Sequence, residues 1–319
     1  MELRILGCSG GIGGDLSTTS LLIDDDILID GGTGISELSL EQMARVRHIF
    51  VTHSHLDHIA GIPMLLDSIF DQVSQPVKLY ARPETLQILR DHIFNWQVWP
   101  DFSCLPSSER AVLQFVPMTP GEQQRIEGRS VEMIEVNHVV PAAGYRVQNG
   151  VGSFAFSGDT TSNDGFWEAL NRHEKLDLLI VESAFTDEDR ELSAKAHHYC
   201  PELLAEDLKK LRHRPPLYLT HLKPGSEKKI LEQCRSRIEA LVVPVLTDGS
   251  TAATDLVANG TLTLRADQAA GLVLTGTGEV VQYVQDDRLD LCFEFDLSYA
   301  IHGALNGGWA GGLLGKAQQ

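Results

Sequence analysis

The stretch Thr52-His53-Ser54-His55-Leu56-Asp57-His58-Ile59-Ala60-Gly61-Ile62 decides how this chain is interpreted. It places four potential metal ligands within six residues, after an apolar run and before a segment with helical spacing. Imidazole and carboxylate ligands together suit zinc, manganese and iron. Two histidines at i and i+2 can bind one ion, while Asp57 and His58, just past the turn, can face a second. The alternative is four polar residues crowding a surface turn by chance; we predict a metal centre instead.

Further candidate ligands occur at the ends of other predicted strands. His138 follows Val131–Val136, Asp159 follows Ser153–Phe156, and His221 follows Leu217–Leu219, as His53 follows His48–Val51. Parallel strands in layered α/β folds place their carboxyl ends along one edge, where sites form. One such residue alone would be an ordinary core or surface side chain, but four strand ends of this kind predict a shared site.

The pattern H-x-H-x-D-H resembles the metal-binding signature of the metallo-β-lactamase superfamily, and the resemblance extends over roughly residues 1–250. It implies that His53, His55 and His138 hold one divalent ion, and that Asp57, His58 and His221 hold the other. Asp159 would bridge the two ions, one carboxylate oxygen to each. Zinc is the expected metal, with manganese or iron as alternatives. The remaining histidines are interpreted as structural or surface residues: His48, His92, His173, His197, His213 and His302.

Two features resemble the class II cyclic nucleotide phosphodiesterases of that superfamily. His53–Ile62 fits their pattern H-x-H-L-D-H-aliphatic-x-G-aliphatic, and the aromatic segment Phe94–Ser103 looks like an insertion typical of that class. The resemblance implies hydrolysis of 3′,5′-cyclic nucleotides, cyclic AMP or cyclic GMP, to 5′-monophosphates. Trp96, Trp99 or Phe102 would then offer a flat apolar face to a nucleobase. The alternative for this loop is a lid or a subunit contact unrelated to substrate.

A third region is similar to a paired element of the tRNA 3′-end nucleases of the same fold. Glu182, at a strand end, and His198, before a helix, take the places of a Glu that orients a His. The small hydroxyl pair that usually follows this His is replaced by Tyr199 and Cys200, which puts a hydroxyl contact to phosphate in doubt. His197 is an alternative to His198, and a helix-end hydrogen bond without chemistry is the alternative for the pair.

These resemblances imply a division of catalytic roles. Asp57 would orient an attacking hydroxide, and His198 in its cationic form, oriented by Glu182, would protonate the departing 3′-oxygen. Lys223, two residues after His221, would neutralise phosphate charge, or else be a solvated surface residue.

Apolar periodicity predicts a sandwich of the αββα type. Strands are expected first and helices interleaved later, which is typical of two sheets with helices outside. The expected strands are Leu3–Leu6, Ser20–Ile23, Ile27–Ile29, His48–Val51, Val77–Ala81, Val131–Val136, Ser153–Phe156, Leu178–Val181 and Leu217–Thr220. The expected helices are one through Leu65–Phe70, then Pro83–Phe94, Asp164–Arg172, Pro201–His213 and Glu227–Ala240, with an irregular loop over Asn95–Ser108.

The secondary structure expected from the sequence changes near Thr261. We expect a catalytic domain over residues 1–260 and a β-hairpin-rich extension over 261–319, with hairpin material at Leu262–Leu264, Leu272–Val284 and Leu289–Phe295. The Gly- and Ala-rich end, Gly303–Gln319, is expected to be poorly ordered. The sequence does not indicate what this extension does.

The amino-acid composition limits the kinds of binding partner that we expect. The formal net charge is −18, with 26 basic against 44 acidic residues, which favours a small substrate, such as the cyclic nucleotide that the resemblance implies, over an extended nucleic-acid surface. Five scattered cysteines, no signal-peptide layout at Met1–Leu6 and no long apolar run predict a cytoplasmic protein without a membrane partner. A homodimer is one arrangement to expect. Alternative functions are RNA processing similar to ribonuclease Z, hydrolysis of carboxylic esters or lactones by the same fold, and a non-catalytic sensor.

Overall fold

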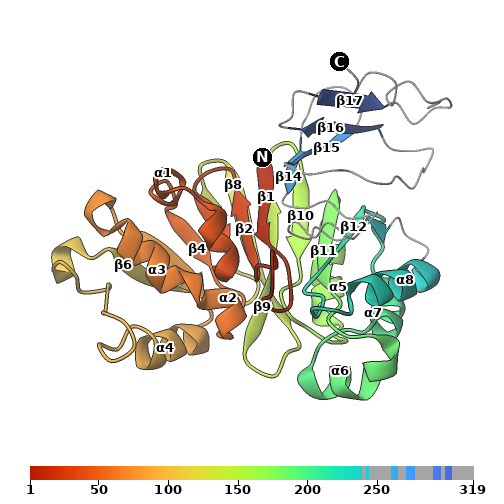
Figure 1. Cartoon of the computed structure of the whole chain (residues 1–319), viewed down its shortest axis with the longest axis horizontal. Helices are drawn as coiled ribbons and strands as arrows, with labels where there is room; N and C mark the ends of the chain where they lie inside the picture. The colour runs from red at the N-terminus through yellow and green to blue at the C-terminus, as the bar shows by residue number, and fades with distance from the viewer. Residues whose placement is uncertain (239–241, 244–259, 265–270, 277–289, 296–298, 304–319) are drawn as a thin grey trace.

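The described strands of the computed structural model form two sheets that pack face to face (Figure 1). The structure describes residues 1–238 and the strand segments 242–243, 260–264, 271–276, 290–295 and 299–303. In the first sheet the order is β17-β16-β15-β14-β1-β2-β3-β4-β5-β6, and in the second it is β13-β12-β11-β10-β9-β8-β7. Helices α1–α4 lie outside one sheet and α5–α8 outside the other, so the αββα prediction is confirmed.

The bounds of the elements follow chain order. The strands of the first 238 residues are β1 Glu2–Gly7, β2 Ser20–Ile23, β3 Ile27–Ile29, β4 His48–Phe50, β5 Val77–Ala81, β6 Leu113–Pro117, β7 Gln123–Ile126, β8 Arg129–Val136, β9 Ala142–Gln148, β10 Ser153–Phe156, β11 Leu178–Glu182 and β12 Leu217–Thr220. The helices are α1 Leu40–Met43, α2 Leu56–Ile59, α3 Gly61–Ser68, α4 Pro83–His92, α5 Gly165–Asn171, α6 Arg190–Ala196, α7 Pro201–Leu208 and α8 Glu227–Arg237.

Strands β3 and β4 of the first sheet place buried side chains on both faces. In β3, Ile27 and Ile29 belong to the core between the sheets, while Leu28 belongs to the second core, beneath α3 and α4. Phe50 of β4 likewise faces the other sheet, and Ile49 faces the helices. Successive side chains of a strand point to opposite faces, so a doubly covered strand needs an unbroken apolar run. This explains why these strands were predictable from short apolar stretches.

The parallel parts of the two sheets position the site. Strands β3, β4, β5 and β6 are parallel to one another, as are β10, β11 and β12. Each parallel set therefore delivers several carboxyl ends to the same edge of its sheet. The predicted convergence of strand-end residues has its structural basis here.

Several predicted helices are shorter in the structure, including α8, which ends at Arg237 rather than Ala240, and several elements were not predicted. Helix α7 ends at Leu208 rather than His213, because the next turns close with tighter bonds, including Lys210 N–H to Asp207 O (2.9 Å) and Leu211 N–H to Leu208 O (3.2 Å). Helix α4 ends at His92 rather than Phe94. Among the α-helices and strands of the first 238 residues, sequence reasoning missed α1, α2, α6, β6, β7 and β9.

The C-terminal segments that the structure describes add strands to the first sheet. β14 (Gly260–Leu264) pairs antiparallel with β1 and with β15 (Gly271–Gly276), and β16 (Asp290–Phe295) pairs antiparallel with β17 (Tyr299–Gly303). β15 and β16 are parallel, so they are not the two arms of one hairpin. The turn expected at Gly276-Thr277-Gly278 and the tail after Gly303 fall outside the described residues. A two-residue strand, β13 (Val242–Val243), borders β12.

No helix in the described part of the chain combines the length and apolarity needed to cross a bilayer. Cys104, Cys200 and Cys234 form no disulfide within the described part of the chain.

Candidate metal centre

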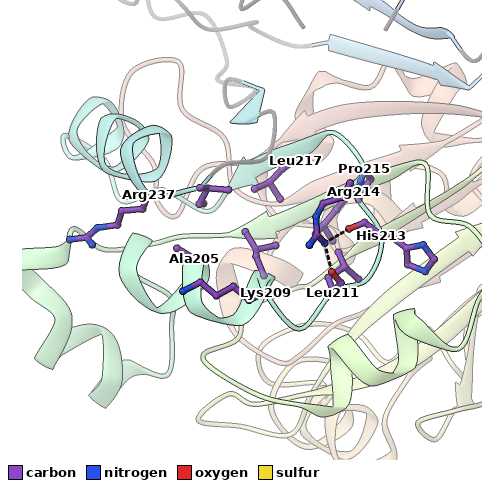
Figure 2. A pocket seen from close by; sticks show the side chains of 11 residues that line it. Ala205, Lys209, Leu211, His213, Arg214, Pro215, Leu217 and Arg237 are labelled. Carbon is purple, nitrogen blue, oxygen red and sulfur yellow. Dashed lines mark hydrogen bonds between the residues drawn. The ribbon is translucent and has the colours of Figure 1, made fainter. Parts of the chain in front are cut away.

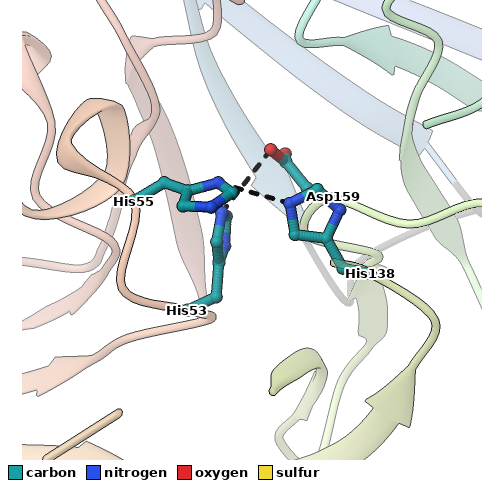
Figure 3. A group of neighbouring side chains, drawn as sticks. All are labelled: His53, His55, His138 and Asp159. Carbon is teal, nitrogen blue, oxygen red and sulfur yellow. Dashed lines mark hydrogen bonds and ion pairs between the residues drawn. The ribbon is translucent and has the colours of Figure 1, made fainter. Parts of the chain in front are cut away.

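Two groups of His and Asp side chains meet between the sheets, and they share one carboxylate. The first group is His53, His55, His138 and Asp159; the second is Asp57, His58, Asp159 and His221. In each group the ligand atoms lie within 4.8 Å of one another. Figure 3 shows His53 and His55, from the segment after β4, facing His138 and Asp159 from the second sheet. All seven predicted ligands come together, in the two predicted sets.

Asp159 lies where a bridging ligand would. Its Oδ2 is 3.7 Å from His53 Nε2 and 3.3 Å from His58 Nε2, and its Oδ1 is 3.3 Å from His221 Nδ1. Gly158, the residue before it, has φ +60, and a Cβ there would come within 2.8 Å of Ala143 O. Glycine at this position allows the sharp turn that aims the carboxylate between the two groups.

The buried ligand atoms lack other partners. His53 Nε2, His58 Nε2, Asp159 Oδ1 and His221 Nδ1 are buried and make no hydrogen bond within the described residues. Buried polar atoms without a partner cost free energy, and in native proteins they usually have one. Divalent cations would satisfy all four atoms at once, and this donor set of imidazole and carboxylate suits zinc, manganese or iron. The residues therefore fit a metal centre.

Asp30 orients the candidate metal ligand His58 through the ring nitrogen that faces away from the centre. Sequence reasoning missed this residue. Its Oδ2 lies 2.7 Å from His58 Nδ1, and its Oδ1 accepts a 2.7 Å hydrogen bond from the Thr52 amide. A carboxylate on the far nitrogen of a histidine ligand fixes the ring and its tautomer. Asp30 directly follows β3, so the strand-end rule that found the other ligands could have found it as well.

A main-chain carbonyl orients a second ligand. His138 Nδ1 lies 3.0 Å from the carbonyl oxygen of His197. His197 follows α6 in the left-handed conformation, with φ +52. The imidazole of His197 faces Asn137 Oδ1 (3.2 Å). His197 thus contributes its backbone to the site.

His198 and Glu182 form a close buried pair. His198 Nδ1 is 2.7 Å from Glu182 Oε1, and Glu182 also accepts hydrogen bonds from the amides of Thr160 (3.0 Å), Ala184 (3.0 Å) and Tyr199 (3.3 Å). The ring of His198 stacks on His221 with centroids 5.2 Å apart, and its centroid is 5.0 Å from that of His138. The structure therefore places the predicted pair directly beside both metal-ligand groups.

Tyr199 turns its hydroxyl away from this pair. Tyr199 OH lies 2.7 Å from Asp207 Oδ2, which also accepts from Trp167 Nε1 at 3.1 Å. Tyr199 and Cys200 are fully buried. The replacement of the usual hydroxyl pair thus builds the core behind His198 and leaves no phosphate contact from Tyr199.

Charges and burial shift the pKa of His138 and His221 in one direction and that of His198 in the other. Burial lowers the pKa of His138 to about 4 and that of His221 to about 3, so both rings are neutral and able to bind a cation near pH 7. Burial also acts to lower the pKa of His198, but the neighbouring carboxylates of Glu182 and Asp159 outweigh it and raise this pKa. Against the effect of burial, Asp159 and Asp30 also raise the pKa of His58. Because His58 belongs to a ligand group, His198 is the ring suited to carry a proton.

Asp57 and Lys223 lie at the open side of the centre. The Asp57 side chain is 30% exposed, whereas those of His58 and Asp159 are almost fully buried. Lys223 is bonded through Nζ to the carbonyl of Gly10 (3.0 Å) and through its amide to that of Ala184 (3.2 Å). Lys223 is therefore held by defined contacts close to His221 and is not a freely solvated surface residue.

The structure of the aromatic loop contradicts the prediction that Phe102 offers its ring to a nucleobase. Phe102 is 2% exposed and packs against Phe70 and Phe94, so its ring is part of the second core and cannot receive a nucleobase. Trp99 also packs against this core. Trp96 is 61% exposed and stays a candidate for a substrate or partner contact.

A separate cavity of about 320 Å³ lies at the opposite end of the strands. Leu179 and Leu217, near the starts of β11 and β12, line it together with Leu211 and Arg214 (Figure 2). Because the metal ligands follow the carboxyl ends of such strands, this cavity is not part of the metal centre.

Comparison with known proteins gives both a family match and named relatives. A family model described as "Beta-lactamase superfamily domain" matches residues 26–222. A probable 3′,5′-cyclic-nucleotide phosphodiesterase from Yersinia pestis is 26% identical over 281 residues, covering 71% of this chain and 79% of the relative. A ribonuclease Z from Crocosphaera subtropica is 31% identical over 157 residues, covering 46% of this chain and 47% of the relative.

Among solved structures, unliganded yeast PDE1 is similar to this chain with a TM-score of 0.63 at 19% identity. The match covers 74% of this chain and 93% of that structure. At this identity the likeness is one of fold.

Proposed function

This chain belongs to the β-lactamase superfamily, and from that premise we propose that it is a dinuclear-metal phosphodiesterase that hydrolyses 3′,5′-cyclic nucleotides to 5′-monophosphates. The observation that carries the proposal is the position of Asp159 in both ligand groups, with the Glu182–His198 pair beside them. A dinuclear centre next to a proton donor is suited to in-line displacement at phosphorus.

Seven side chains would hold the two ions. His53, His55 and His138 would hold one and Asp57, His58 and His221 the other, with Asp159 shared. When bound, divalent cations lower the pKa of water and neutralise the charge that develops on a phosphoryl group. Zinc is the proposed metal; manganese and iron suit the same ligands.

The chain's own residues would position the nucleophile and protonate the leaving group. Asp57, the most accessible of the carboxylates here, would orient the attacking water with its outer oxygen. His198 would donate the proton from Nε2 to the departing 3′-oxygen, since its Nδ1 is engaged by Glu182. The raised pKa of His198 keeps that proton in place near neutral pH; burial opposes this shift, but the carboxylates of Glu182 and Asp159 outweigh it.

The charge balance supports a small substrate. A net charge of −18 repels a long polyanion unless its binding surface is strongly basic, whereas a cyclic nucleotide carries a single phosphate. The relative from Yersinia pestis, named as a probable cyclic-nucleotide phosphodiesterase, supports the same substrate class.

RNA processing is the second candidate. The similarity to a ribonuclease Z and the Glu182–His198 pair favour it, and the acidic balance opposes it. Binding of an RNA substrate should weaken steeply with added salt, while binding of a cyclic nucleotide should change little. Activity on acyl esters without activity on bis(p-nitrophenyl) phosphate would instead indicate an ester hydrolase.

Product analysis tests the proposal. Metal-loaded protein is incubated with cyclic AMP, cyclic GMP and a 2′,3′-cyclic nucleotide, and the products are separated by chromatography. We expect cleavage of a 3′,5′-ring to the 5′-monophosphate. A protein with full metal content that opens only the 2′,3′-ring, or none of the three, contradicts the proposal.

A further inference from the structure

Phe185 is a partly exposed aromatic residue beside His198. The two ring centroids are 5.7 Å apart with an interplanar angle of 58°. Phe185 lies three residues after Glu182, just past the end of β11, and its amide donates to the Tyr199 carbonyl (3.3 Å). The ring is therefore held by the same two segments that carry the proposed proton donor and its carboxylate.

His198 links this ring to the metal-ligand groups. Its imidazole is close to both the Phe185 ring and the His221 ring, and it stacks on the latter at an interplanar angle of 16°. The Nδ1 atom of His198 is bonded to Glu182, so Nε2 is the nitrogen that can face a substrate. Within the described residues, Nε2 does not belong to the buried polar atoms that lack a partner. A substrate that takes a proton from Nε2 must therefore lie close to Phe185.

Lys223 borders the same space. Its amide bonds to the carbonyl of Ala184, the residue before Phe185, and its ammonium is fixed to Gly10 O. A lysine whose backbone is bonded to Ala184 and the aromatic ring of Phe185 thus occupy adjoining positions, a combination that suits a phosphate joined to a nucleoside.

Resting on the proposed function, we propose that Phe185 is the residue on which the substrate's nucleobase packs. Every base has a flat π-face, so stacking on phenylalanine gives affinity with little discrimination between bases. Among the aromatic residues first considered for this role, Phe102 is buried and Trp99 packs against the second core. Phe185 instead directly adjoins the group that must reach the leaving oxygen.

The test compares a substrate that has a base with one that lacks it. Phe185→Leu is assayed with cyclic AMP and with methyl p-nitrophenyl phosphate, and its metal content is measured. We expect kcat/KM for cyclic AMP to fall about 10- to 100-fold, mostly through KM, with the base-free diester changed less than about twofold. Phe185→Trp should restore cyclic AMP hydrolysis. Phe115→Leu, at a partly exposed phenylalanine on β6, is the matched control and should change neither substrate.

A binding measurement separates stacking from a structural effect on His198. The dissociation constant of AMP should rise in Phe185→Leu, while that of ribose 5-phosphate should stay constant. Equal losses on both substrates, or unchanged kinetics with cyclic AMP, would overturn the inference alone. A loss of cyclic AMP binding in Trp96→Leu but not in Phe185→Leu would assign the base to the aromatic loop instead. A wild-type protein that is inactive on both diesters would overturn the proposed function, and this inference with it.

Discussion

Replacement of His198 by alanine separates proton donation from metal binding. The imidazole is bonded to Glu182 at 2.7 Å, and within the described residues it belongs to neither metal-ligand group. Its removal should therefore leave the seven ligands in place. The variant should keep its metal content and its affinity for substrate while losing the step that protonates the leaving oxygen.

The magnitude follows from the burial of the pair and from the leaving group. A positioned general acid contributes about 10²- to 10⁴-fold, or about 3–5 kcal/mol of transition-state stabilisation. An alkoxide such as the 3′-oxygen of a nucleotide needs that proton. A nitrophenolate is a far weaker base and departs without it. The loss in kcat should therefore be large for cyclic AMP and small for bis(p-nitrophenyl) phosphate.

Glu182→Gln provides a pH test of the same pair. Burial lowers the pKa of His198, but the carboxylates of Glu182 and Asp159 outweigh it, so the pKa is raised. An acid must be protonated to act, so kcat falls as the pH rises through this pKa. Removing the charge of Glu182 should move that alkaline limb to lower pH by about 1–3 units. Near-normal turnover of cyclic AMP by His198→Ala, or equal losses on both substrates, would refute the assignment of His198 as proton donor.

Four further predictions concern the metal centre and its supports. Asp159→Ala should lose metal and activity together, and an unchanged ion content by elemental analysis would argue against a bridging carboxylate. Asp30→Asn should weaken metal affinity about 10- to 100-fold in equilibrium dialysis, because Asp30 orients His58. His197→Gly should retain metal and turnover, since only its carbonyl contacts the site and glycine accepts φ +52; a large loss of turnover would give the imidazole a role. In metal-free protein, burial lowers the pKa of His138 to about 4, so folding keeps this ring neutral while the unfolded chain binds a proton below about pH 6.5. Between pH 6.5 and 4 the wild type should therefore lose about 3 kcal/mol of stability relative to His138→Gln in urea unfolding, and parallel pH profiles would contradict this.

The metal ligands could be predicted because strand ends constrain them strongly. The apolar runs before His53, Asp159 and His221 are buried strands, and parallel strands bring their carboxyl ends together. The structure assembles these residues in the predicted groups. The Glu182–His198 pair was predictable by resemblance, and the structure gives its distance.

Features that depend on tertiary contacts were not predictable in the same way. Strand β9 is buried between β8 and β10, although Gly144 interrupts its apolar run, and pairing on both sides compensates for weak local propensity. The carbonyl of His197 reaches His138 only after α6 ends in a left-handed residue. Phe102 and Trp96 lie in one aromatic loop, and only packing decides which of them is buried.

The most direct test of the account is a metal titration of the metal-free protein, followed by the rate of bis(p-nitrophenyl) phosphate hydrolysis. The shared Asp159 predicts that activity rises with added divalent metal and reaches its maximum at two equivalents per chain. Full activity without metal or with one equivalent, or no activity once two equivalents are bound, would contradict the central claim that a dinuclear centre drives phosphodiester hydrolysis.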